Sequence, residues 1–291
     1  MNKLENKDLI IEVKNTGAEL SRIYSKTLNK EFLWNGNKKF WGRHSPILFP
    51  IVGRLKDNET IIDEKTYNMN QHGFARDFDF NLIEKDQNSL TYKLASTGET
   101  KKYYPYDFEL FIKYIITETE IKVCWKVINT DCSDIFFSIG AHPAFNVPFD
   151  KDTTIDNYYL NFKTRDEVSN YLLQGPFVCK KSKVDNLKSI KLHPEIFKND
   201  ALIYDNVDEI TISSKNSSTS INVKFDNFPF VGVWSPYDTE ENTIAPFVCI
   251  EPWFGIADCL DSNKIFKNKL GINQLSPNKT FEASYSITIN S

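Results

Sequence analysis

The sequence predicts an all-β protein, a large antiparallel β-sandwich, and three observations support this prediction. Several segments alternate polar and apolar residues with a period of two, which is the pattern of half-buried strands. Convincing helical stretches are few, and neither a βαβ rhythm nor an internal repeat is present. The absence of GxGxxG and GxxxxGK[ST] motifs argues against a nucleotide-binding α/β fold.

The candidate strands are spread over the whole chain. A β-branched run predicts the first of them, and alternation predicts most of the others; they cover residues 9–13, 108–116, 120–127, 208–213, 220–225 and 281–289. Three residues separate the second and third segments, which predicts a hairpin, and a Lys/Asn/Ser turn cluster pairs the fourth with the fifth. Apolar runs at 136–140 and 246–250 predict buried strands, and residues 195–197 favour a short helical turn.

Length and composition favour one domain spanning residues 1–291. No long linker divides the chain, and 41% hydrophobic residues, many of them aromatic, supply enough apolar material for a large core. The net charge is −4 and no basic stripe is visible, which argues against nucleic acid as a partner.

The same features predict a cytoplasmic protein without a membrane partner. Residues 1–14 lack the apolar segment of a signal peptide, and no apolar run approaches the length of a bilayer span. The five cysteines include no CxxC pair, so we expect free thiols rather than zinc ligands or disulfides.

Two of the four histidines lie in compact segments punctuated by Gly or Pro. His72 lies in QHGFARD, where it fits a turn or a strand end, and His142 lies in GAHPAFN. Because Pro143 biases the preceding residue toward extended backbone, we expect His142 to project from the end of a buried strand. Each histidine taken alone is equally compatible with a structural hydrogen bond, and for His44 and His193, in polar surroundings, that is the favoured interpretation.

A carboxylate and two guanidinium groups complete the candidate site. Glu251 continues an apolar strand, where a carboxylate is rarely buried without a partner. Trp253 follows closely, and its ring suits the apolar face of a sugar. Arg54 interrupts an apolar run, and its planar donors suit hydroxyl or phosphate groups; Arg76 is similar, and a loop-holding salt bridge is the alternative for both.

Four motifs occur in a characteristic order along the chain: FPIVGRL (49–55), QHGFAR (71–76), GAHPAFNVP (140–148) and CIEPW (249–253). Together they resemble the aldose 1-epimerase (mutarotase) family, and within it the LacX-like branch. The resemblance runs from about Thr16 to the final strand. It implies the galactose mutarotase-like supersandwich, which agrees with the strand pattern.

The resemblance implies an isomerase that interconverts the α and β anomers of a hexose or hexose phosphate. His142 would be the general acid and Glu251 the general base of ring opening and closure, and His72 and Arg54 would bind and orient the sugar. The chemistry needs no metal and no cofactor, and the expected partner is a small-molecule sugar, bound by a monomer or weak homodimer. We expect proximity to raise the pKa of His142 and to lower that of Glu251.

The substrate is less well defined by these motifs. An aspartate before a strand usually contacts sugar hydroxyls in this family, and Asp200 matches better than Asp205. The pattern from His72 to Arg76 is nearer to the hexose-6-phosphate epimerases, where arginines hold the phosphate, yet arginines are scarce in this chain. Free and phosphorylated hexoses therefore both stay open.

Two other functions compete with this interpretation. A non-catalytic carbohydrate-binding or sugar-sensing protein could use the same fold, although binding alone needs neither an acid nor a base. A glycoside hydrolase or lyase could also resemble this chain, but hydrolases usually need two catalytic carboxylates, and only Glu251 is clearly placed by the sequence.

Overall fold

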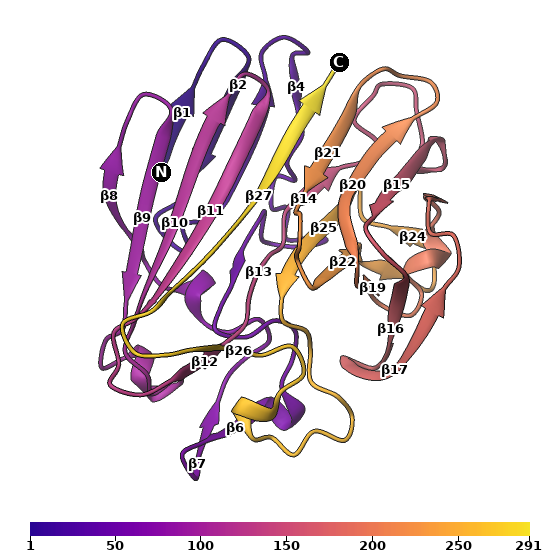
Figure 1. Cartoon of the computed structure of the whole chain (residues 1–291). Helices are drawn as coiled ribbons and strands as arrows, with labels where there is room; N and C mark the ends of the chain where they lie inside the picture. Colours follow the sequence, from indigo (N-terminus) through magenta and orange to yellow (C-terminus); the bar gives the residue numbers. More distant parts are fainter.

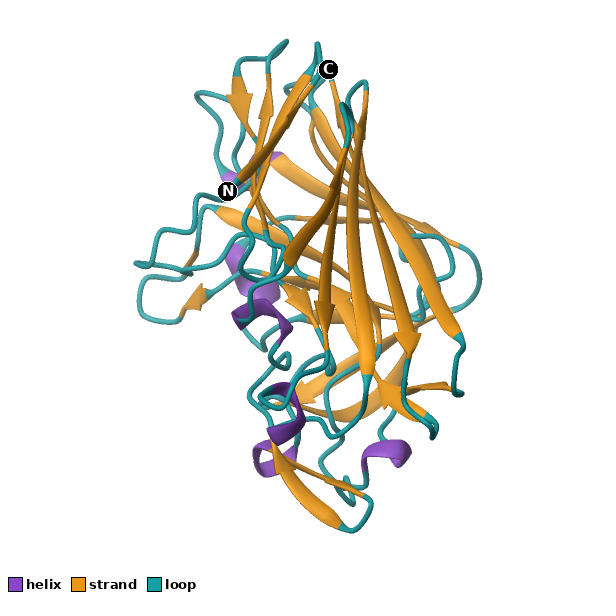
Figure 2. Cartoon of the chain, turned by 90° about the vertical axis from the view of Figure 1, so that its left-hand side faces the viewer, coloured by secondary structure: helices purple, strands orange, loops and turns teal.

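The computed structural model describes residues 1–291 and confirms the all-β fold. Two large antiparallel sheets hold most of the strands, and smaller sheets flank them (Figure 1). The helices are short 3-10 turns located in the connections between strands (Figure 2). No helix has the length and apolar character needed to cross a membrane.

The larger sheet has nine strands. Their spatial order is β18 (Ser189–Lys191), β15 (Tyr158–Thr164), β20 (Val207–Ser214), β21 (Ser220–Lys224), β27 (Thr280–Asn290), β11 (Glu120–Asn129), β10 (Phe108–Thr117), β9 (Ser89–Ala95) and β8 (Asn81–Lys85). The predicted hairpin is confirmed as β10 and β11, whose register pairs Thr117 with Glu120. The second predicted pair is confirmed as β20 and β21, where Ser213 pairs with Ser220.

The second sheet has eight strands and carries the candidate site. Its path is β17 (Phe177–Val184), β16 (Val168–Gln174), β19 (Leu202–Tyr204), β22 (Phe230–Trp234), β25 (Phe247–Phe254), β13 (Ile139–Ala141) and β5 (Ile47–Leu48), and β14 (Ala144–Asn146) also pairs with β25. Alternation sorts the side chains of β25 by face: Val248 and Ile250 enter the main core, whereas Glu251 and Trp253 face the other side.

A smaller sheet and three ribbons complete the fold. The N-terminal sheet contains β1 (Asn2–Glu5), β2 (Leu9–Val13), β3 (Leu20–Ser25) and β4 (Lys30–Glu31). The ribbons are β6 (Glu59–Ile62) with β7 (Lys65–Asn68), β12 (Ile135–Phe137) with β26 (Asn273–Leu275), and β23 (Tyr237–Asp238) with β24 (Thr243–Ile244). The 3-10 helices are η1 (Lys56–Asn58), η2 (Ala75–Asp77), η3 (Thr100–Lys102), η4 (Ile155–Asn157), η5 (Pro194–Phe197) and η6 (Phe266–Asn268). The last but one of these is the short turn expected at residues 195–197.

One hydrophobic core joins the three larger sheets. It includes Ile11 from the N-terminal sheet, Val123 and Ile287 from the nine-stranded sheet, and Val248 from the eight-stranded sheet. Its members run from Leu4 to Ile289. The core fixes one face of the eight-stranded sheet and leaves the other face to form a cavity.

Candidate active site

A cavity of about 440 Å³ lies on the face of the eight-stranded sheet that points away from the main core. That volume falls within the range of about 300–1,000 Å³ that is usual for small-molecule sites. All seven residues that the sequence nominated for the site line this cavity: His72, Arg54, Arg76, His142, Asp200, Glu251 and Trp253.

Glu251 lies within β25, where it continues the apolar run of residues 247–250. Its partner across the sheet is Gly232 on β22. A Cβ atom on Gly232 would lie 2.4 Å from the ring of Trp253, so only glycine leaves room for the indole there. Trp253 is 5% exposed and therefore forms a wall of the cavity rather than an open stacking surface.

His142 follows the last residue of β13, which confirms its expected place at the end of a buried strand. Its Nε2 lies 3.3 Å from Oε2 of Glu251. Nevertheless Oε2 of Glu251 and Nδ1 of His142 are buried atoms without a hydrogen-bond partner. The two groups are adjacent but unpaired in hydrogen-bond geometry, which leaves both available to a third molecule.

Burial, rather than mutual attraction, dominates the protonation of this pair. Burial lowers the pKa of His142 to about 3, and it raises the pKa of Glu251 well above its usual value. The expected directions were the opposite, and that expectation is wrong because both groups are almost fully removed from water. Desolvation penalises the charged form of each group, so burial favours a neutral imidazole beside a protonated carboxyl.

His72 reaches the cavity from a loop, as expected for a residue before glycine. Its backbone is left-handed, with φ of 67°, and a Cβ atom on the following Gly73 would lie 2.3 Å from the carbonyl oxygen of Phe49. The Gly53 amide donates to its Nδ1 at 3.1 Å, so the proton of the neutral ring is on Nε2. Burial lowers the pKa of His72 well below its usual value, and the ring lies edge-on to His142 at 5.4 Å.

Three of the five arginines in the chain line the cavity. Arg43 donates to Asp77 at 2.8 Å, and Arg76 donates to the Gln71 carbonyl at 2.6 Å. Arg54 donates only to the Gln71 side-chain oxygen, at 3.2 Å, and its buried Nε has no partner. Arg54 is therefore the least neutralised cation in the cavity.

The structure separates the two candidate aspartates. Asp200 lines the cavity, and burial raises the pKa of its carboxyl. Asp205 instead accepts hydrogen bonds from the Ser169 amide at 2.6 Å and the Tyr171 hydroxyl at 3.1 Å, and it pairs with Lys181 at 3.0 Å. Asp205 thus has a structural role, because it holds neighbouring strands together.

Comparison with known proteins places the chain in a family. The sequence model of the aldose 1-epimerase family matches residues 1–270. The chain belongs to the aldose 1-epimerase family. It is 31% identical to the plasmid-encoded protein LacX of Lactococcus lactis subsp. lactis over 306 aligned residues, which cover 99% of this chain and 98% of that protein.

Solved structures that are similar to this chain agree with the fold. A galactose mutarotase related enzyme from Lactobacillus acidophilus is 34% identical, with a TM-score of 0.94 over 100% of this chain and 97% of that one. A galactose mutarotase-like protein from Lactobacillus casei is 29% identical, with a TM-score of 0.92 over 100% of both chains. The resemblance to the LacX-like branch and the galactose mutarotase-like fold are both confirmed.

Two tryptophans at the cavity were not predicted from the sequence of this family member. Trp41 stacks on His142, with ring centroids 4.7 Å apart and an angle of 26° between the planes, and Trp234 meets the same ring edge-on at 5.7 Å. Both are half-buried and line the cavity, so they offer the ring surface that the sequence assigned to Trp253. The one signal was the Trp41-Gly42-Arg43 run, which places an aromatic ring beside an arginine.

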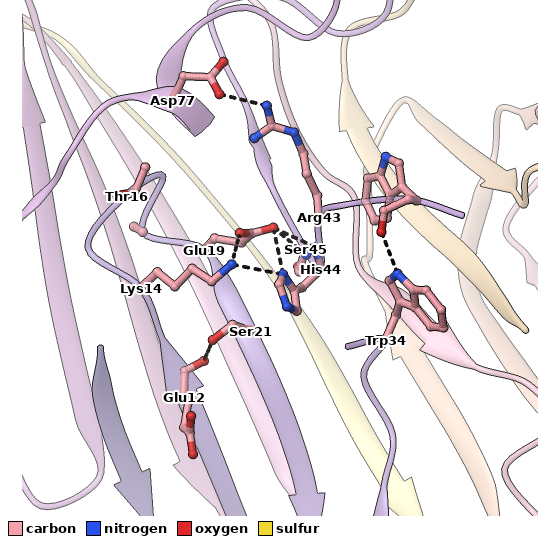
Figure 3. A network of polar contacts seen from close by, with 12 residues as sticks. Glu12, Lys14, Thr16, Glu19, Ser21, Trp34, Arg43, His44, Ser45 and Asp77 are labelled. Carbon is pink, nitrogen blue, oxygen red and sulfur yellow. Dashed lines mark hydrogen bonds and ion pairs between the residues drawn. The ribbon is translucent and has the colours of Figure 1, made fainter. Parts of the chain in front are cut away.

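A buried carboxylate outside the cavity holds the segment that carries Trp41 and Arg43 (Figure 3). Glu19 accepts hydrogen bonds from the backbone amides of His44 at 2.8 Å and Ser45 at 3.2 Å, and it pairs with Lys14 at 3.0 Å. Burial opposes ionisation, but these partners hold the pKa of Glu19 at about 2.

The same network explains His44. Its Nδ1 lies 3.1 Å from the Lys14 amine and 3.7 Å from Glu19, so the structural role favoured from the sequence fits this histidine. The indole of Trp34 donates to the Trp41 carbonyl at 2.8 Å and fixes the other end of the segment. These contacts anchor the rim of the cavity to the N-terminal sheet.

Proposed function

We propose that this protein is a mutarotase that interconverts the α and β anomers of a hexose or hexose phosphate. The observation that carries the proposal is the pair His142 and Glu251, 3.3 Å apart at the floor of a sugar-sized cavity and not hydrogen-bonded to each other. An acid and a base that both face the cavity fit ring opening, in which one oxygen gains a proton while another loses one.

In the proposed mechanism, the Glu251 carboxylate accepts the proton of the anomeric hydroxyl O1, and the His142 imidazolium donates a proton to the ring oxygen O5. The C1–O5 bond breaks and an open-chain aldehyde forms. After rotation about C1–C2, the carboxyl returns its proton to O1, the imidazole takes the proton back from O5, and O5 attacks the other face of C1. No atom or electron is left over, so the cycle needs no cofactor.

The pair passes through two protonation states in this cycle. Ring opening starts from an imidazolium and a carboxylate and ends with a neutral imidazole and a protonated carboxyl. Burial favours the second of these states, so a proton passes from Glu251 to His142 before ring opening. Both states hold one proton in total, so the pair moves between them without exchanging protons with solvent, and burial stabilises the state that accompanies the open-chain aldehyde.

Arg43, Arg54 and Arg76 support a phosphorylated hexose over a free one. Arg43 and Arg76 lie beside Asp77, whereas Arg54 has no carboxylate within ion-pair distance. A guanidinium that is largely desolvated and unneutralised suits an anionic group, because a charge-assisted hydrogen bond is stronger than a neutral one. Asp200 would then bind the sugar hydroxyls at the same end of the cavity as Arg54, whose charge acts on that carboxyl.

The deciding assay is NMR exchange between anomers over a panel of free aldoses and hexose 6-phosphates. Anomer exchange above the uncatalysed rate for at least one sugar supports the proposal. Saturable binding of a sugar without exchange would instead favour the non-catalytic sugar-binding alternative. Release of a reducing end from a disaccharide would favour a hydrolase, for which Glu251 and Asp200 would be the two carboxylates.

The pH profile of kcat/KM should be flat through neutrality. Activity falls in acid only when the pair gains a second proton, for which the pKa of His142 is about 3, and it falls in alkali when the raised pKa of Glu251 lets the single proton leave. Exchange rates corrected for the uncatalysed reaction test this. A break at about pH 6.5, where an unperturbed histidine titrates, would contradict the buried, neutral imidazole.

Arg54→Ala should raise KM by about tenfold with little change in kcat, because its contact is made equally in the ground and transition states. Arg22→Ala is the matched control, since Arg22 pairs with Glu12 and Glu31 on the N-terminal sheet. A rise in KM confined to phosphorylated hexoses identifies the phosphate contact. An unchanged KM for every accepted sugar would remove Arg54 from the binding site.

A further inference from the structure

Beside the proposed acid and base lies a polar side chain that the mechanism does not use. Cys249 precedes Glu251 by two residues on β25, so its thiol is on the same face of the strand. A ring nitrogen of His142, the sulfur of Cys249 and a carboxylate oxygen of Glu251 lie within 4.8 Å of one another. Imidazole, thiolate and carboxylate are the three side-chain ligands that Zn²⁺ accepts in proteins.

One atom of this cluster has unmet bonding capacity. Oε2 of Glu251 is buried without any hydrogen-bond partner. It lies 3.3 Å from Nε2 of His142, and the two residues are only 2% and 6% exposed, respectively. Leaving a buried polar atom unpaired is costly, and such atoms are few in native proteins. A ligand that accepts lone pairs would remove this cost.

We propose that His142, Cys249 and Glu251 form a binding site for one thiophilic divalent cation, with Zn²⁺ as the type case, and that the bound cation excludes sugar from the cavity floor. The site would be inhibitory, because the cation occupies the two groups that act on the sugar. The cation site itself goes beyond the proposed function and does not depend on it, whereas the inhibitory effect rests on that function.

Charge balance favours such a complex in a buried place. An ionised thiol and an ionised carboxylate carry two negative charges, which neutralise the two positive charges of the cation while the imidazole stays neutral. Binding releases one proton from the thiol and one from the His142–Glu251 pair. The low-dielectric surroundings that disfavour each ion alone therefore accept the neutral assembly.

Cation binding would require only a small decrease in the distances between the three ligand atoms. Tetrahedral Zn²⁺ places its ligand atoms about 3.5 Å apart. Nε2 of His142 and Oε2 of Glu251 are already 3.3 Å apart, so the sulfur of Cys249 would make most of the movement. His142 and Glu251 line the cavity, which provides the entry path and leaves a fourth position for water. Mg²⁺ and Ca²⁺ prefer oxygen ligands and should not bind.

Cobalt(II) is the probe, because thiolate coordination gives it a charge-transfer absorption in the near ultraviolet. Titration of the intact protein with Co²⁺ should produce this band, and Zn²⁺ should displace it. Cys249→Ala should lose the band while keeping its sugar exchange, since Cys249 has no part in the proposed mechanism. The matched control is Cys259→Ala, which removes a half-buried thiol outside the cluster and should keep the band.

Thermal unfolding gives a second readout. Zn²⁺ should raise Tm of the wild type and of Cys259→Ala, but not of Cys249→Ala, each compared with its own metal-free form. No thiolate band in the wild type, or an equal band and Tm shift in Cys249→Ala, would overturn the site. Metal binding without any anomer exchange would keep the site and remove the proposed function, and the reverse result would do the opposite.

Discussion

Glu251→Gln is expected to lower kcat for anomer exchange by roughly 10²–10⁴-fold, the usual contribution of a positioned general base. The amide keeps the shape of the side chain but cannot accept the O1 proton. Because burial favours the neutral form of this carboxyl, a neutral amide should leave the fold and sugar binding intact. NMR exchange rates give the loss, and a ligand titration measures binding separately.

His142→Asn is the companion variant. It should also lose activity, because asparagine cannot supply the proton that the ring oxygen O5 accepts. The double variant should lose little more than either single variant, because each defect stalls the same concerted step. Retention of wild-type exchange by Glu251→Gln, on the best substrate found, would contradict the mechanism. The non-catalytic sugar-binding alternative would then be favoured.

Lys269→Met is expected to lower the free energy of unfolding by about 3–5 kcal/mol, because it leaves a buried charge without its partner. Lys269 lies 3.3 Å from Asp258, their side chains are 2% and 3% exposed, and the amine also donates to the Ile256 carbonyl. Asp258 in turn accepts from the Lys56 amide at 2.9 Å and the Ser262 hydroxyl at 3.2 Å. Urea denaturation measures the loss.

The double variant Asp258→Asn with Lys269→Met is the control, and it should lose less than the two single variants together, because neither charge remains. The Asp258 amide donates to the Arg54 carbonyl at 3.0 Å, so the loop of this ion pair also supports the cavity wall. We therefore expect a higher KM in Lys269→Met. A loss below about 1 kcal/mol, as for exposed pairs, would show that the pair is solvated.

The sequence was sufficient for the fold class because alternation is a local signal. The hairpin of β10 and β11 was predicted within one or two residues, since a period of two with a short polar turn permits few other arrangements. The place of His142 at the end of a strand also follows from a local feature, the proline after it, whereas Asp200 was predicted from the family resemblance.

Long-range packing decided what the sequence could not. Trp41 is brought onto His142 by a segment held through Glu19, 22 residues earlier in the chain, and no periodic pattern reports such a contact. The place of Glu251 in the middle of β25 follows from its pairing with β22, which is a property of the sheet.

The sequence by itself determined that the chain is a β-rich member of the aldose 1-epimerase family, and it named seven residues that meet in one cavity. Only the tertiary structure decided which protonation states of His142 and Glu251 are favoured. Proximity of His142 and Glu251, which the motifs imply, favours an ion pair, but the depth of burial favours neutral groups, and burial is a property of the whole assembled sheet. The same burial leaves the unpaired Oε2 of Glu251 in a cluster with Cys249, because folding alone sets which side chains share a desolvated space.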